Sequence, residues 1–237
     1  MEATARFNGQ VVLVTGGTGA LGSAVARAFL QEGASVAVTY RTPQEYEILQ
    51  SSLAADAVRL RGHPTDVTNE AQMLRTTAAI EEEFHRLDGL VNMVGGWTGG
   101  TKLWEAESAT LERMLSLNLR SAFVGARAVV PMLLRQGRGY LVNVAARAAV
   151  DPPAGAGAYA ASKAAAVALM HSLAMELQGT GIRVNSVLPN IIDTPANRRD
   201  MPRADFSTWT KPEEIARVIL FLCTPDARPV NGAAIPV

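Results

Sequence analysis

The stretch VVLVTGGTGALGSAVARAFL, residues 11–30, decides the fold. The β-branched run from Gln10 to Val14 indicates a strand, and the apolar spacing from Ser23 to Leu30 indicates an amphipathic helix closed by Gly33. Between them, four glycines let the backbone approach a ligand, and the free N–H groups at a helix start attract negative charge. A flexible turn without a ligand is the alternative, but this order of elements favours binding of a dinucleotide pyrophosphate.

The next strand bears on the choice of cofactor. Ser35–Tyr40 is expected to be a strand parallel to the first, reached by a right-handed crossover. A carboxylate at its end would accept a hydrogen bond from a ribose 2′-hydroxyl, but here Arg41 follows and the next acid is Glu45. Arg41 is either a forked partner for a 2′-phosphate or an ordinary solvated arginine. We expect NADP(H) to be favoured over NAD(H).

Strand and helix patterns alternate to the end of the chain. They predict an α/β fold, a single Rossmann-like domain over residues 1–237 with a doubly wound parallel sheet of about seven strands and helices on both faces. The further strands are expected at Ala57–Arg61, Leu90–Val94, Tyr140–Ala145, Ile182–Leu188 and Ala233–Val237. The further helices are expected at Pro43–Ala54, Asn69–Phe84 opened by an Asn69–Gln72 capping pair, Ser108–Arg135 with a bend near Pro131, a segment bearing Tyr159 and ending near Gln178, and a final helix to Cys223 capped by Thr210 with Glu213.

Composition narrows the classes of function. With 22 basic and 22 acidic residues the chain has no net charge, so nothing indicates a nucleic-acid partner or electrostatic attachment to a membrane. The only cysteine, Cys223, lies in an apolar run and is expected to be a buried thiol. The three histidines are scattered, so no metal site is expected. Met1–Phe7 lacks a signal-peptide pattern and no apolar run approaches bilayer length, which makes a cytoplasmic protein the default.

The stretch from Tyr159 to Lys163 places a phenol and an ammonium four residues apart in an alanine-rich helical segment, so both project from one face. A neighbouring cation favours the phenolate and lowers the pKa of a phenol from its usual value of about 10. Such a pair suits proton transfer, although Tyr and Lys also meet at this spacing by chance.

Other candidates lie near predicted strand ends and in a helix. Asp66 could accept a hydrogen bond from an adenine amino group, or be only a turn residue. The run Gly95–Gly100 would let a ring or a ribose lie against the backbone, with Trp97 either as a lid over a flat substrate or as a packed surface aromatic. Asn118 is a poor helix former and could leave a backbone carbonyl free for water.

Together these residues resemble the short-chain dehydrogenase/reductase family along essentially the whole chain. The resemblance is carried by Thr15–Gly22, Asp66, Asn118, Tyr159 with Lys163, and Pro189–Thr194. It implies an NAD(P)H-dependent oxidoreductase in which Tyr159 donates or accepts a proton, Lys163 binds the nicotinamide ribose and lowers the Tyr159 pKa, and Asn118 holds a water of a proton relay. It also implies a small-molecule substrate and a homodimer or homotetramer built on the helices around Asn118 and Tyr159. The implied cofactor contacts are Gly16, Thr18, Ala20, Leu21, Gly22, Arg41, Asp66, Val67, Asn92, Val94, Gly95, Tyr159, Lys163, Pro189, Ile192 and Thr194.

A narrower resemblance, to the dihydropteridine reductases, appears in Gly95–Gly100 and in the segment from Asp193 to Trp209. It implies hydride transfer to a quinonoid dihydropterin with Tyr159 supplying a proton. The polar, proline-containing segment 190–211 is too long for an ordinary connection and is expected to be a substrate lid. The residues expected to face the substrate are Ala146, Trp97, Met201 and Trp209.

One departure from the family pattern bears directly on chemistry. Where the family carries a catalytic serine, thirteen residues before Tyr159, this chain has Ala146. Loss of one donor to a developing oxyanion commonly costs several kcal/mol of transition-state stabilisation, so reduction of an ordinary ketone should suffer. Dihydropteridine reductases also lack this serine, and a quinonoid ring is electrophilic enough for Tyr159 alone to suffice.

Three functions therefore stand side by side. The first is a reductase of a conjugated or quinonoid acceptor, which Ala146 favours. The second is a general carbonyl or 3-oxoacyl reductase of the same family, which Ala146 disfavours. The third is a cofactor-binding sensor or scaffold without catalysis, against which the joint presence of Tyr159, Lys163 and Asn118 counts.

Overall fold

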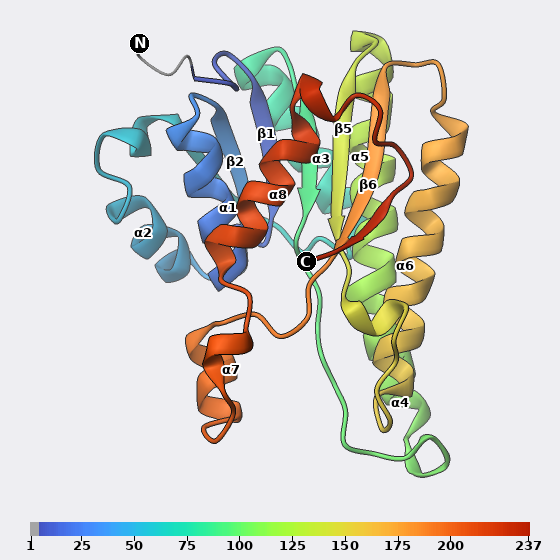
Figure 1. Ribbon diagram of the computed structural model, residues 1–237. Helices are drawn as coiled ribbons and strands as arrows, with labels where there is room; N and C mark the ends of the chain where they lie inside the picture. Colours follow the sequence, from blue (N-terminus) through green and yellow to red (C-terminus); the bar gives the residue numbers. More distant parts are fainter. Residues whose placement is uncertain (1–4) are drawn as a thin grey trace.

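Seven parallel strands form one sheet in the order β3-β2-β1-β4-β5-β6-β7 in the computed structural model, which describes residues 5–237 (Figure 1). The predicted α/β class with a doubly wound parallel sheet is confirmed. The expectation drawn from Met1–Phe7 falls partly on residues 1–4, which lie outside the described residues. The strands are β1 (Val11–Thr15), β2 (Ser35–Tyr40), β3 (Leu60–Pro64), β4 (Gly89–Asn92), β5 (Gly139–Val144), β6 (Ile182–Leu188) and β7 (Ala234–Pro236).

Helices cover both faces of this sheet. The first core cluster lies under α1 and α8, and the second lies under α3, α5 and α6 on the opposite face (Figure 1). The helices are α1 (Ala20–Gln31), α2 (Pro43–Ser51), α3 (Glu70–Phe84), α4 (Ser108–Met114), α5 (Ser121–Gln136), α6 (Gly157–Glu176), α7 (Pro195–Asp200) and α8 (Pro212–Cys223).

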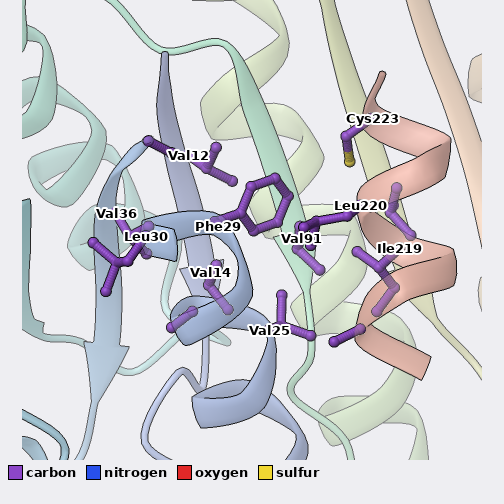
Figure 2. Packing of buried hydrophobic residues seen from close by; sticks show 14 of the residues in the cluster. Val12, Val14, Val25, Phe29, Leu30, Val36, Val91, Ile219, Leu220 and Cys223 are labelled. Carbon is purple, nitrogen blue, oxygen red and sulfur yellow. The ribbon is translucent and has the colours of Figure 1, made fainter. Parts of the chain in front are cut away.

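The central strand β1 is buried on both faces. Val12 and Val14 point into the cluster that also holds Phe29 of α1 (Figure 2). Val11 and Leu13 belong to the cluster on the other face, because successive side chains of a strand point in opposite directions. A strand covered on both sides needs apolar residues at every position, which is why this run shows no polar alternation.

The turn after β1 is tight because two glycines shape it. Gly16 has a φ of +62°, a conformation that favours glycine, and its amide donates a 2.9 Å hydrogen bond to Oγ1 of Thr39. Gly22, in the first turn of α1, passes so close that a β-carbon there would lie 2.2 Å from the Gly16 carbonyl oxygen. These contacts bring the start of α1 directly beneath the end of β1, the arrangement predicted for a pyrophosphate-binding turn.

The position of β3 corrects the sequence-based prediction. The strand spans Leu60–Pro64, whereas Ala57–Arg61 was predicted. The preceding residues, Ala54–Arg59, form a 3-10 helix that is closed by a 2.5 Å ion pair between Arg59 and Asp56. This local pairing holds in a turn the residues that the apolar pattern assigned to a strand. α2 also ends earlier than predicted, at Ser51 rather than at Ala54.

The start of α8 is also displaced from its predicted cap. The backbone amide of Lys211 donates a 2.9 Å hydrogen bond to the carboxylate of Glu214. Pro212 occupies the first helical position, where a missing N–H leaves no hydrogen bond unmade. The predicted cap by Thr210 with Glu213 is therefore wrong by one residue.

The long helical region after β4 contains an irregular segment that the sequence did not predict. Its hydrogen bonding becomes π-helical at Leu115–Arg120, whereas Pro131 lies within α5. By length and composition alone, the run Ser108–Gln136 could cross a membrane, because an 18-residue window within it has a mean hydropathy of 1.3. However, 56% of that window is buried inside the fold. The expectation that no apolar run approaches bilayer length overlooked it, because polar residues such as Asn118 interrupt the run.

Gly22→Ala is expected to lower the free energy of unfolding by about 1–3 kcal/mol, because the added methyl group would meet backbone atoms that cannot turn aside. Urea denaturation followed by circular dichroism measures the change. Gly19→Ala is the matched control, since its β-carbon would lie 3.4 Å from the same Gly16 carbonyl oxygen. Its effect should stay below about 1 kcal/mol, and equal losses in the two variants would contradict this account.

Candidate active site

A cavity of about 500 Å³ opens at the carboxyl ends of β1, β2, β3 and β4. The strand order reverses between β1 and β4, which is where open parallel sheets bind their ligands. The cavity brings together many of the predicted cofactor contacts. Its lining includes Gly16, Thr18, Arg41, Asp66, Val67, Val94 and Gly95 among the predicted residues, and also Gly19, Thr39, Tyr40, Glu45, Thr65, Thr68, Met93, Gly96 and Leu117.

This cavity fits a dinucleotide. No side chain caps the amino end of α1 at Gly19, so the helix start is open to an anion. A β-carbon at Gly16 would lie 2.9 Å from the side chain of Val94, which shows how closely the turn approaches the loop after β4.

Within residues 5–237, no three His, Cys, Asp or Glu side chains gather as metal ligands would.

The remaining predicted cofactor contacts lie around the cavity rather than in its lining. Ala20, Leu21 and Gly22 form the first turn of α1 beneath the glycine turn. Beyond β6, the carbonyl oxygen of Pro189 accepts a 2.8 Å hydrogen bond from the amide of Arg147, which joins the loops after β5 and β6. Farther along the same loop, Ile192 and Thr194 each accept a hydrogen bond from Asn197 at the start of α7.

Asn92 holds the strand ends together. Its Oδ1 accepts a 2.9 Å hydrogen bond from Thr15 Oγ1, and its Nδ2 donates a 2.8 Å hydrogen bond to Asn143 Oδ1. Thr15 Oγ1 also accepts from the Met93 amide, at 3.0 Å. This row, Thr15–Asn92–Asn143, fixes where the loop after β4 leaves the sheet.

Sequence reasoning missed Thr39 and Asn143 as supports of the site. Both are polar residues at the end of an otherwise apolar strand, on the face that α3, α5 and α6 cover. That pattern is a usable signal, because a polar side chain buried at such a position must find a partner. Asn143 Nδ2 is itself buried without a hydrogen-bond partner in the described part of the chain.

Asn118 joins three elements around the loop after β4. From the π-helical segment, its Oδ1 accepts from the Gly96 amide at 2.9 Å, and its Nδ2 donates to the Gly96 carbonyl oxygen at 3.1 Å. The same Nδ2 donates to Ser162 Oγ of α6 at 2.9 Å. The side chain is 2% exposed, so it is fully committed to holding the loop and α6 in place.

Gly95 is the point where the predicted catalytic side chains converge. A β-carbon there would lie 2.7 Å from Asn118 Oδ1 and 2.8 Å from Lys163 Nζ. The absence of a side chain at Gly95 thus lets the amide and the ammonium approach the same stretch of backbone. Lys163 Nζ donates a 3.1 Å hydrogen bond to the Val144 carbonyl oxygen at the end of β5.

Burial shifts the pKa values of both members of the predicted proton-transfer pair. Desolvation lowers the pKa of Lys163 to about 8 and raises the pKa of Tyr159 to about 12. The sequence predicts the opposite direction for Tyr159, on the ground that a neighbouring ammonium stabilises a phenolate. In this structure the loss of water around the phenol dominates, and the Lys163 ammonium is engaged by the Val144 carbonyl.

Trp97 and Ala146 are two of the residues predicted to face the substrate. The rings of Trp97 and Tyr159 meet edge to face with centroids 5.1 Å apart, while Trp97 remains 61% exposed. Ala146 is buried and brings no hydroxyl. The nearby Ser162 hydroxyl does not replace one, because it donates to the Tyr159 carbonyl oxygen at 2.7 Å and accepts from Asn118.

The predicted lid, residues 190–211, has its own internal packing. Arg198 of α7 pairs with Asp193 at 2.5 Å and lies over the ring of Phe206 at 4.7 Å, which in turn packs on Trp209 at 4.8 Å. Trp209 is 8% exposed, so it is part of this packing, whereas Met201 is half-buried. Figure 1 shows α7 at the same end of the sheet as the segment before α4.

The two ends of the lid are joined in a parallel bridge between Ile192 and Thr210. The amide of Asp193 donates a 2.9 Å hydrogen bond to the Thr210 carbonyl oxygen at the same place. The chain therefore enters and leaves the lid at adjacent points.

Comparisons with known proteins agree with this geometry. Residues 10–204 match the family described as short chain dehydrogenase. The chain is 33% identical to D-threitol dehydrogenase of Mycolicibacterium smegmatis, over 96% of this chain and 91% of that one. It is 30% identical to a 3-oxoacyl-[acyl-carrier-protein] reductase of Thermotoga maritima, over 98% and 97%. The crystal structure of a 3-ketoacyl-(acyl-carrier-protein) reductase from Brucella melitensis complexed with NADH superimposes with a TM-score of 0.87 at 26% identity, over 98% and 97%.

The family match covers most of the chain, and both curated relatives align along nearly all of it. The cavity lies at the reversal of strand order, and Lys163 and Asn118 approach Gly95, one of the residues that line it. The chain therefore belongs to the short-chain dehydrogenase family and is an oxidoreductase of the kind that binds NAD(P).

Proposed function

We propose that this protein transfers hydride from NADPH to a conjugated or quinonoid acceptor, with a dihydropterin as the leading candidate, and that Tyr159 supplies the proton. Ala146 is the observation that carries the proposal. It brings no hydroxyl to the position where the family resemblance implies one, and Ser162 is already committed to other partners. An acceptor that is already electrophilic depends least on the missing donor.

The groups of the site hold the proton and the positive charge that the proposed reduction needs. With its pKa raised to about 12, the Tyr159 phenol keeps its proton at neutral pH and can donate it as negative charge develops on the acceptor. Lys163, with a pKa of about 8, is mainly an ammonium at pH 7 and lies next to the Gly95 backbone, where it can hold a ribose hydroxyl. The nicotinamide, when bound, supplies the hydride, so that two electrons and two hydrogen nuclei reach the acceptor.

Trp97 supports a flat acceptor. Its ring lies against Tyr159, and a β-carbon at Gly99 would lie 1.7 Å from the far edge of this ring. Trp97 is thereby held between Tyr159 and the Gly99 backbone, and the residue remains largely exposed beside the proposed proton donor. Aromatic faces favour planar, conjugated partners.

A general carbonyl or 3-oxoacyl reductase is the second candidate. It is supported by the names of similar proteins, which include the reductases of Thermotoga maritima and Brucella melitensis. The two candidates differ in the effect expected from Ala146. Reduction of an ordinary ketone would proceed without a hydroxyl donor that the reaction normally uses, whereas reduction of a conjugated acceptor would not require that donor.

We also propose a cytoplasmic homodimer or homotetramer that acts on a small molecule. The helices around Asn118 carry a surface hollow of about 730 Å³ whose lining includes Leu115, Leu119, Phe123 and Leu169. Phe123 is 45% exposed there. An apolar hollow of this kind supports association with a second copy.

Ala146→Ser separates the two candidates. Steady-state oxidation of NADPH is measured with quinonoid dihydropterin and with a simple ketone. The native protein should turn over the dihydropterin and reduce the ketone poorly, and the serine should raise kcat/KM for the ketone about tenfold or more with little effect on the dihydropterin. Absence of dihydropterin turnover with either nicotinamide would reject the leading candidate. Tyr159→Phe is the control, and full activity in that variant would show that the Tyr159 hydroxyl does not supply the proton.

Arg41→Ala tests the preference for NADPH. Arg41 is exposed, lines the cavity directly after β2 and forms no ion pair within residues 5–237. Loss of a charged hydrogen bond to a 2′-phosphate should weaken NADPH binding about tenfold or more, while NADH binding changes little. Fluorescence titration with both cofactors measures the two dissociation constants. If the variant bound NADPH and NADH more weakly by the same factor, Arg41 would not be a partner of the 2′-phosphate.

Lys163→Met should stabilise the fold while abolishing activity. Below about pH 8 both folded and unfolded chains protonate Lys163, so the folded state carries the whole cost of a buried ammonium. Between about pH 8 and 10.5 only the unfolded chain binds this proton, so the stability of the native protein rises with pH. The variant should therefore exceed it by about 1–3 kcal/mol at pH 7, with the difference shrinking toward pH 10.

Denaturant unfolding at a series of pH values tests this prediction. The matched control is Lys102→Met, which removes an exposed lysine. A Lys163→Met variant whose stability follows the native pH profile in parallel would show that Lys163 is not the group that titrates.

A further inference from the structure

The corner of the cavity next to Arg41 holds a second charged residue, Glu45. Both residues line the cavity. Oε2 of Glu45 accepts a hydrogen bond of 3.1 Å from Oγ1 of Thr18, which belongs to the glycine turn. A carboxylate is thus held against the glycine turn, in the same cavity as the arginine assigned to the 2′-phosphate.

The backbone places Glu45 there. Thr42 caps α2, Pro43 is its first residue, and the amide of Glu45 donates to the Thr42 carbonyl oxygen at 3.2 Å. Tyr46, the next residue, stacks on Tyr40 with centroids 5.1 Å apart and a 16° angle between the rings. This stacking ties the first turn of α2 to the end of β2, so Glu45 faces the glycine turn because its helix is fixed.

Two opposite charges share this corner without neutralising each other directly. Neither Glu45 nor Arg41 takes part in an ion pair within residues 5–237. In the same part of the chain, Glu45 Oε1 accepts no hydrogen bond from a protein side chain, so one carboxylate oxygen remains available.

The two forms of the cofactor would meet this carboxylate differently. A ribose 2′-hydroxyl can donate a hydrogen bond to it, as acidic residues in dinucleotide sites do. A 2′-phosphate carries negative charge and is repelled by it, while Arg41 attracts the same phosphate. The side chains at one corner therefore favour opposite cofactors.

We infer that Glu45, held by Thr18, is a second selectivity residue that acts against the 2′-phosphate and for the 2′-hydroxyl, so that it partly cancels Arg41 and the protein accepts both NADPH and NADH. This inference rests on the proposed function only in placing the adenosine end of the cofactor in this cavity. If Glu45 acts in this way, the protein binds NADPH only modestly more tightly than NADH.

Glu45→Gln tests the inference directly, because the amide oxygen still accepts from Thr18 while the charge is gone. Isothermal titration calorimetry compares adenosine 2′,5′-bisphosphate with adenosine 5′-monophosphate, two ligands that differ only in the 2′-phosphate. The variant should bind the bisphosphate about three- to tenfold more tightly and the monophosphate no more tightly than the native protein does. The gain should shrink as salt is raised, since the charges lie at an exposed site.

Glu47→Gln is the matched control. Glu47 lies on the same helix, is exposed and does not line the cavity, so its loss should change neither affinity. Equal effects in the two variants, or a gain for the bisphosphate below twofold in Glu45→Gln, would overturn the inference while leaving the proposed function intact. Failure of both nucleotides to bind the native protein would overturn the proposed function and, with it, this inference.

Discussion

A buried polar row at the strand ends is the constraint on which the site depends. The strands of this sheet are covered on both faces, so a polar side chain at a strand end has no water to bind and must pair with its neighbour. Thr15, Asn92 and Asn143 are joined by hydrogen bonds across β1, β4 and β5, which leave only Nδ2 of Asn143 without a partner among these three side chains. The same row anchors the Met93 amide, and so it directs the loop after β4 toward the glycine turn. The cavity exists because these two loops leave the sheet at fixed points.

Two of the side chains predicted to be catalytic then converge on a position without a side chain. Gly95 admits Asn118 from the π-helical segment and Lys163 from α6 to the same stretch of backbone. Close approach excludes water, and exclusion of water moves the pKa of Lys163 downward and that of Tyr159 upward. The buried ammonium of Lys163 is a cost to the stability of the fold, and under the proposed function this cost places a positive charge beside a ribose and a proton donor.

Sequence patterns predicted the parts of the fold that local chemistry determines. The bounds of β2 and β6 agree with prediction because apolar runs end at clear polar or glycine signals, and α3 begins as its Asn69–Gln72 pair predicted. β3 was misplaced because an ion pair between Arg59 and Asp56 stabilises a turn within an apolar stretch. In the site, motif spacing located Tyr159 and Lys163. It could not give the direction of the Tyr159 pKa shift, which depends on burial, or the role of Glu45, which depends on how α2 lies against the glycine turn.

The segment 190–211, predicted to be a lid, makes many of its contacts within itself. Its aromatic and ionic contacts, Arg198 with Asp193 and Phe206 with Trp209, are made within the segment, and its two ends meet at the bridge between Ile192 and Thr210. A segment that is packed on itself and closed at its base can be exchanged for another of different length without altering the sheet. Divergence of acceptor choice in such a chain needs no change in the machinery that moves the hydride and the proton.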